Sequence, residues 1–135
     1  MEKFKTRYNK LNSAQKQAVD TIDGPLLVVA GPGTGKTELL SMRAANILRA
    51  TDTLPENILC LTFTDSGANA MRARLASIIG TDAYKVAIQT FHSFGTEIIN
   101  HHSEYFYRGA DFSPADEVAT YSILTDIFEE LGYNN

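Results

Sequence analysis

The feature that most constrains this 135-residue sequence is a glycine-rich segment in its first third. The segment consists of Ala30, Gly31, Pro32, Gly33, Thr34, Gly35, Lys36 and Thr37, and we call it the phosphate loop. The apolar run Leu26–Ala30 leads into it and predicts a buried strand, while the apolar positions within residues 37–49 recur with helical spacing. A strand, a glycine-rich turn and a helix in this order are typical of a loop that cradles phosphates.

The phosphate loop predicts how a nucleotide is held. Its backbone N–H groups and the N-terminus of the following helix attract phosphate oxygens. In loops of this kind the lysine, here Lys36, bridges the β- and γ-phosphates, and the hydroxyl of the threonine, here Thr37, ligates Mg²⁺. We therefore expect Lys36 and Thr37 to be catalytic and all eight loop residues to bind a nucleoside triphosphate. The pattern indicates a nucleotide site and no particular reaction.

The rest of the sequence alternates between strand and helix patterns. Apolar runs predict further buried strands at Ile58–Phe63 and Val86–Ile88. Helices are expected over residues 12–22, 65–79, 93–102 and 113–131, with a solvated lead-in over residues 1–10 and an aromatic-rich loop over residues 103–112. Strands that are apolar throughout and alternate with helices predict an α/β fold, in which helices cover both faces of a parallel sheet.

Composition and charge narrow the classes of protein further. Hydrophobic residues make up 44% of the chain, and the net charge of −4 argues against a simple basic nucleic-acid binder. Residues 1–102 nevertheless hold eleven basic against nine acidic residues, so this part can lie near phosphates. No apolar run is long enough to span a membrane, and the start does not read as a signal peptide. We expect a cytoplasmic protein without a membrane partner.

Gln15, upstream of the loop, has two interpretations. A glutamine amide can donate to and accept from an adenine edge at once, which would select ATP over GTP. Asn12 and Gln15 also have the spacing of a capping box, in which Gln15 only closes the end of its own helix. The segment alone leaves both interpretations open.

Two further segments follow the predicted strands. Thr62-Phe63-Thr64 ends the second strand, and Thr90-Phe91-His92 ends the third. The carboxyl ends of parallel strands form the edge at which ligands bind, so Phe63 could stack on a nucleic-acid base and Thr64 could bond a phosphate. In isolation a core position is the more common role for a strand aromatic, but two Thr-Phe pairs at one edge are hard to attribute to packing alone.

An acidic pair that could hold Mg²⁺ and polarise water should end an apolar strand. Asp116-Glu117 instead follows Pro114 in a predicted first helical turn, and Glu129-Glu130 lies within a helical pattern. We therefore expect the hydrolytic acid to lie outside this chain.

In this order and spacing, four segments resemble motifs of the UvrD/Rep group of superfamily 1 DNA helicases. They are Leu11–Val19, the phosphate loop, Thr62-Phe63-Thr64 with Met71-Arg72-x-Arg74, and Thr90-Phe91-His92. The resemblance implies a RecA-like first lobe that uses ATP and Mg²⁺ to move along single-stranded DNA, with 3′-to-5′ polarity, and to unwind duplexes. Residues 1–112 would be the N-terminal part of this incomplete ATP-binding lobe, and residues 113–135 the start of a helical insertion.

The resemblance also implies roles for single residues. Gln15 would read adenine and Arg74 would approach the nucleotide, while the DNA-facing residues would be Phe63, Thr64, Thr90, Phe91 and His92. Several positions depart from the pattern, among them Glu38, where the residue after the loop threonine is usually arginine, and the stretch Asp65-Ser66-Gly67-Ala68, where the family usually has Asn-Lys-Ala-Ala. The second RecA-like lobe of these helicases is missing from the sequence, so we expect an N-terminal fragment that binds ATP without unwinding DNA.

Two other classes stay open on the sequence. A small kinase or an RNA-type superfamily 1 helicase would share the phosphate loop, although neither is expected to carry Thr90-Phe91-His92 after the third strand. The chain could also be a fragment that binds nucleotide or a partner and has no activity of its own.

Overall fold

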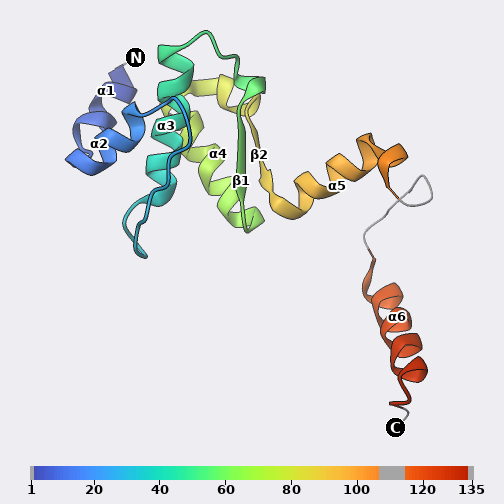
Figure 1. Ribbon diagram of the computed structural model, residues 1–135. Helices are drawn as coiled ribbons and strands as arrows, with labels where there is room; N and C mark the ends of the chain where they lie inside the picture. The colour runs from blue at the N-terminus through green and yellow to red at the C-terminus, as the bar shows by residue number, and fades with distance from the viewer. Residues whose placement is uncertain (1, 107–114, 134–135) are drawn as a thin grey trace. The chain divides into compact units, whose positions relative to one another are not determined.

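The computed structural model describes residues 2–106 and 115–133, which divide into two units, Met1–Phe94 and Gly95–Asn135. The first unit has four complete helices and two strands, which Figure 1 labels. They are α1 (Glu2–Asn9), α2 (Ser13–Asp20), α3 (Lys36–Ala50), β1 (Leu59–Thr62), α4 (Asp65–Ile79) and β2 (Ala87–Thr90), with short 3₁₀ turns η1 (Pro55–Asn57) and η2 (Gly80–Tyr84). The structure is therefore mixed helix and strand, as predicted.

The two strands pair in parallel, and Leu59 and Thr62 lie opposite Ala87 and Thr90. Helix α4 connects them and packs against both strands and against α3 (Figure 1). The strands predicted at Ile58–Phe63 and Val86–Ile88 are thus confirmed, with shifted ends. In the part of the chain that the structure describes, the parallel sheet has two of the three predicted strands.

The core of the first unit lies between α2, α3 and α4. Its fully buried side chains include Val19, Met42 and Leu75, one from each helix. The amide of buried Asn46 donates to the carbonyl of Val19 over 3.0 Å, which satisfies both groups away from water. This packing holds α2 against α3, the helix that begins at the phosphate loop.

The solvated lead-in predicted over residues 1–10 is wrong. Residues 2–9 form helix α1, and Phe4 and Tyr8 pack against the core with their rings stacked 5.8 Å apart. The guanidinium of Arg49 lies 5.0 Å from the Phe4 ring. Phe4 and Tyr8 are four residues apart and therefore lie on one face of a helix. Packing of this face against the core favours a helix although most residues of the segment are polar.

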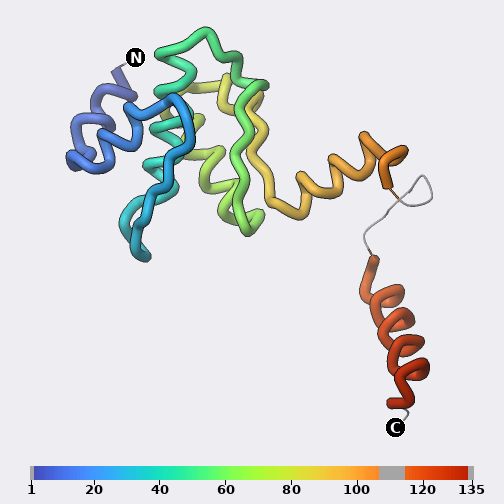
Figure 2. Tube along the Cα trace, in the orientation of Figure 1, coloured from blue at the N-terminus to red at the C-terminus, as the bar shows by residue number. Residues whose placement is uncertain are grey.

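The strand predicted at Leu26–Ala30 is also wrong. The segment is extended but unpaired with any described strand, and Figure 2 traces it between α2 and α3. The exposed fractions of Leu27 and Val29 are 89% and 92%. A strand needs hydrogen-bonding neighbours, and neither β1 nor β2 lies beside this segment in the sheet order.

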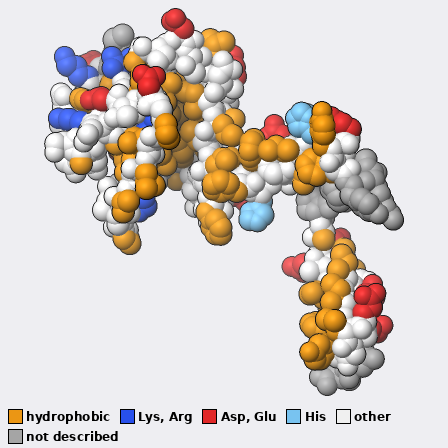
Figure 3. Space-filling model, in the orientation of Figure 1, with side chains coloured by type: hydrophobic (Ala, Val, Ile, Leu, Met, Phe, Trp, Pro, Cys, Tyr) orange, Lys and Arg blue, Asp and Glu red, His pale blue; other side chains and the backbone are white. Residues whose placement is uncertain are grey.

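Helix α3 leaves an apolar face uncovered next to this segment. Its residues Leu40 and Arg43 border a hollow of about 380 Å³ shared with Leu26 and Val28. The same two residues border a second hollow, of about 240 Å³, shared with residues of β1. Figure 3 shows hydrophobic side chains at the surface of this part of the molecule. The structure thus has open apolar surface on α3 between the segment before the loop and the sheet.

Helix α5 (Phe91–His101) begins at the end of the first unit and continues into the second, which also holds η3 (Ser103–Tyr105) and α6 (Glu117–Glu130). The carboxylate of Asp116 accepts from the backbone N–H of Ala119 over 2.7 Å and caps α6. The predicted domain boundary after residue 112 lies outside the described residues and stays a prediction. In the described ranges no helix is both long and apolar enough to cross a membrane.

Candidate nucleotide site

The phosphate loop forms a tight turn, and its last two residues, Lys36 and Thr37, begin α3. Gly33 and Gly35 have φ values of 72° and 83°, a left-handed conformation that glycine adopts without strain. The hydroxyl of Thr34 donates to the carbonyl of Gly31 over 2.7 Å and braces the turn. Gly35 is the N-cap of α3, and no side chain caps the helix there. The first N–H groups of α3 are therefore available to an external acceptor.

Lys36, the first residue of α3, folds back over the loop. Its ammonium donates to the carbonyls of Ala30 and Gly31 over 3.2 Å and 2.6 Å. The cation thus lies over the same turn that presents the uncapped N–H groups. Thr37 follows in the first helical turn, half-buried, and the hydroxyl of Ser41 donates to its carbonyl over 2.8 Å. A bound anion and its metal ion would meet Lys36 and Thr37 together.

Gln15 joins α2 to the loop. Its side-chain oxygen accepts from the backbone N–H of Asn12 over 3.0 Å, and its own N–H donates to the Asn12 side chain over 2.9 Å. The capping box considered for this pair is therefore present. The Gln15 amide nitrogen also donates to the carbonyl of Thr34 over 3.2 Å. Gln15 borders a hollow of about 260 Å³ that Lys36 and Thr34 share, so the capping role does not remove it from the loop.

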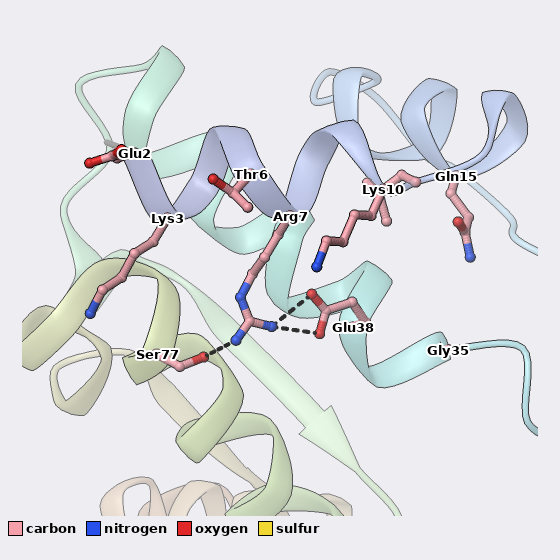
Figure 4. Close-up of a pocket in the computed structure, with 10 residues that line it drawn as sticks. Glu2, Lys3, Thr6, Arg7, Lys10, Gln15, Gly35, Glu38 and Ser77 are labelled. Carbon is pink, nitrogen blue, oxygen red and sulfur yellow. Dashed lines mark hydrogen bonds and ion pairs between the residues drawn. The ribbon is translucent and has the colours of Figure 1, made fainter.

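Arg74 reaches the first turn of α3 through Glu38. The Arg74 guanidinium lies 3.6 Å from a carboxylate oxygen of Glu38, which is the residue after Thr37. Arg7 of α1 contacts the same carboxylate from another side, at 3.0 Å. Figure 4 shows Arg7 placed between Glu38 and Ser77, with Lys3 of α1 and Lys10, which follows α1, on either side of it. The residues labelled there, Gln15 and Gly35 among them, border a cavity of about 880 Å³, which Arg74 does not line.

Arg7 is a residue of this site that the sequence analysis missed. A solvated lead-in over residues 1–10 predicts no role for the basic side chains there. The signal that could have found it is the spacing of Phe4 and Tyr8, which predicts a helix whose other face carries Lys3, Arg7 and Lys10.

The two segments after the strands meet at one edge of the sheet. Thr62 pairs with Thr90 in the register, so Phe63 and Phe91 each follow a strand at the same level. Their exposed fractions are 81% and 58%, which excludes the core position considered for Phe63. His92 is exposed as well. The edge therefore presents two aromatic rings to solvent.

The two threonines assigned to this edge also hold helix ends. The hydroxyl of Thr64 accepts from the N–H of Gly67 over 3.0 Å and caps α4. Buried Thr90 accepts from the N–H of Ser93 over 3.1 Å in the first turn of α5. Each threonine thus has a structural role at the position where the resemblance implies a contact with DNA.

The acidic pairs lie at the two ends of a helix, as their sequence context indicated. Asp116 caps α6 and Glu117 begins it, and Glu129 and Glu130 end it. Within residues 2–106 and 115–133, no cluster of three or more His, Cys, Asp or Glu residues is arranged to hold a metal ion.

A family model for the UvrD/REP helicase N-terminal domain matches residues 11–135. The chain belongs to this family. The match begins at Leu11, two residues after the end of α1, so it includes Gln15, the phosphate loop and both segments at the sheet edge, and leaves Arg7 outside. The resemblance noted in the four sequence motifs is thereby confirmed.

Curated relatives in the same family are named ATP-dependent DNA helicase PcrA. The protein from Bacillus subtilis (strain 168) is 38% identical over 120 residues, which are 89% of this chain and 16% of that protein. The protein from Staphylococcus epidermidis (strain ATCC 12228 / FDA PCI 1200) is 36% identical over 119 residues, with coverages of 88% and 16%. The one from Staphylococcus aureus (strain NCTC 8325 / PS 47) is 34% identical over 121 residues, with coverages of 90% and 17%. The chain therefore spans about a sixth of the length of these relatives.

Proposed function

We propose that this chain is the N-terminal, ATP-binding part of a RecA-like lobe in an ATP-dependent DNA helicase. The observation that carries the proposal is the start of α3, where uncapped N–H groups and the ammonium of Lys36 converge on one glycine-rich turn. This is the donor set that a triphosphate requires. When bound, the nucleotide and its Mg²⁺ would supply the energy of phosphate-bond cleavage to the parent protein.

Each loop residue has a part in binding. Lys36 now donates to two neutral carbonyls, and it would exchange them for charged phosphate oxygens, which form stronger hydrogen bonds. Thr37 would ligate Mg²⁺, Gln15 would contact the adenine, and Arg74 would approach the nucleotide from α4. The acidic pairs Asp116-Glu117 and Glu129-Glu130 lie at the two ends of α6 and do not follow a strand. On that ground the isolated chain would bind ATP without hydrolysing it or unwinding DNA.

The exposed aromatic edge supports a DNA-binding role for the parent protein. Phe63 and Phe91 offer stacking surfaces for the bases of single-stranded DNA, with Thr64, Thr90 and His92 beside them. The open apolar face of α3 would receive further strands from the rest of the parent lobe. In this proposal the parent protein is cytoplasmic and moves along DNA in the 3′-to-5′ direction. Its second lobe completes the nucleotide site.

Calorimetric titration of this chain with Mg-ATP and Mg-GTP tests the proposal. We expect ATP to bind more tightly than GTP, and the variant Lys36→Ala to lose binding. Lys85→Ala is the matched control, because it removes the same charge at an exposed residue that pairs with Asp82. A folded chain that binds neither nucleotide, or that binds both equally with Lys36→Ala unchanged, would contradict the proposal.

A further inference from the structure

The first turn of α3 carries a negative charge at the place where a triphosphate would bind. Glu38 is the third residue of α3, directly after Lys36 and Thr37. A carboxylate in a first helical turn is favourable by itself, because it compensates the positive end of the helix. A bound triphosphate uses the same helix end, so an uncompensated Glu38 would compete with it and repel it.

Two arginines from outside α3 compensate this carboxylate. Nη1 of Arg7 lies 3.0 Å and 3.1 Å from the two oxygens of Glu38, and Nε of Arg74 lies 3.6 Å from one of them. The side chain of Glu38 is 24% exposed, and those of Arg7 and Arg74 are 35% and 41% exposed. Partial burial makes the attraction stronger than that of a surface ion pair.

The second terminal nitrogen of the Arg7 guanidinium is also held by a hydrogen bond. Its Nη2 donates to the hydroxyl of Ser77 over 2.9 Å, and that hydroxyl donates to the carbonyl of Arg74 over 2.5 Å. The single guanidinium therefore connects α1 to both α3 and α4, as Figure 4 shows. A planar fork held on two sides keeps its geometry, whereas a lysine at this position would keep only the charge.

We infer that Arg7 is a positioning residue of the nucleotide site, which neutralises Glu38 and keeps its carboxylate turned toward α1. The inference rests on the proposed function and adds that helix α1, outside the region matched by the family model, sets the affinity of the site for a triphosphate. Arg7 does this without touching the nucleotide. Arg74 makes the weaker of the two contacts with Glu38 and supports Arg7 in this role.

The test is a double-mutant cycle on Mg-ATP binding, with Arg7→Gln, Glu38→Gln and the variant carrying both. We expect Arg7→Gln to weaken binding about three- to tenfold at low salt, since it leaves a carboxylate beside the phosphates. Glu38→Gln should bind at least as tightly as the unaltered chain, and the double variant should recover that affinity. Lys5→Gln, on the exposed side of α1, controls for the change in net charge.

Two further measurements separate charge from folding. The ratio of the affinities of the unaltered chain and Arg7→Gln should shrink as salt is raised from 50 to 500 mM, about a threefold shortening of the Debye length. Thermal unfolding of each variant without nucleotide reports any loss of α1 packing. A double variant that binds as weakly as Arg7→Gln would show a purely structural role and overturn the inference, as would unchanged binding by Arg7→Gln. If the unaltered chain binds no ATP, the proposed function fails first and the inference with it.

Discussion

The side-chain nitrogen of Gln15 donates to the main-chain carbonyl of Thr34 over 3.2 Å. A residue in the first turn of α2 is thereby tied to the loop that begins α3, and both polar atoms of its side-chain amide form hydrogen bonds. The proposed adenine recognition and the support of the loop would therefore depend on one side chain. A base that hydrogen-bonds Gln15 would also act on the position of Thr34.

Gln15→Ala and Asn12→Ala together separate these roles. Asn12→Ala removes the cap of α2, and we expect it to lower the free energy of unfolding by about 1 kcal/mol without changing the ratio of ATP to GTP affinity. Gln15→Ala should lower that ratio, because it removes the group proposed to contact adenine. Urea unfolding and calorimetry measure the two effects. Equal losses of ATP and GTP affinity in Gln15→Ala would leave it a purely structural residue.

Gly35→Ala should destabilise the chain through its backbone. Gly35 has a φ of 83°, which strains any residue with a Cβ. The space around it is sufficient, because an added Cβ would lie 3.9 Å from the Gln15 side chain, an ordinary contact distance. The expected cost of about 1–2 kcal/mol therefore arises from the left-handed conformation and not from crowding. Gly31→Ala is the matched control, since its φ is not in that region and its added Cβ would meet Thr34 at 3.8 Å. Chemical denaturation of both variants makes the comparison, and equal stabilities would contradict it.

Thr64→Val should cost about 1 kcal/mol of stability, because the N–H of Gly67 loses the hydroxyl that caps α4. The two side chains have nearly the same shape, so packing changes little. Thr64→Ser retains the hydroxyl and is the control. If the melting curves of Thr64→Val and Thr64→Ser coincide, the cap contributes nothing to the stability of the chain.

Phe63→Ala should leave the stability of the chain within about 0.5 kcal/mol, since the ring is 81% exposed. In the full-length parent we expect the same change to weaken binding of single-stranded oligothymidylate by about 1–3 kcal/mol, the usual contribution of one stacked base. Fluorescence anisotropy measures the affinity, and Tyr84→Ala, at another exposed aromatic, is the control. Unaltered DNA affinity would remove Phe63 from the proposed interface.

Cys60 gives a prediction about pH. Burial raises the pKa of its thiol above the usual 9.0, because the thiolate loses solvation in the folded chain. The unfolded chain ionises this thiol at a lower pH than the folded chain does, so high pH favours unfolding. The stability of the fold is therefore unaffected by Cys60 below pH 9 and decreases as the pH rises through the folded pKa. The rate of alkylation by iodoacetamide should therefore rise at higher pH in the folded chain than in urea. Coincident pH profiles would contradict the shift.

The elements that the sequence predicted well are those whose signals are local. The cap at Asn12, the glycine-rich turn and the apolar runs of β1 and β2 act over a few residues, and all are found near their expected places. The Thr62–Thr90 register follows from the parallel pairing of those two strands. For Phe63 the strand context alone favours a core position, and only the family resemblance favours the exposed position that the structure shows.

The errors arose where structure depends on distant partners. Leu26–Ala30 has the composition of a buried strand, yet a strand forms only beside another, and the described residues do not place one there. Arg7 acquires its role only when α1 folds across α3 and α4, which residue spacing alone does not specify. Glu38 could be identified as a departure from the family pattern, but its two arginine partners lie 31 and 36 residues away in the sequence.

The uncovered segment before the loop has a practical consequence for handling this polypeptide. The segment contains the four exposed, uncharged residues Leu26, Leu27, Val28 and Val29, which favour strands and pair with neither described strand. Such stretches add strands from neighbouring copies and start aggregates. Turbidity should therefore grow with protein concentration, and replacing Val29 by lysine should keep solutions clear at concentrations where the original clouds.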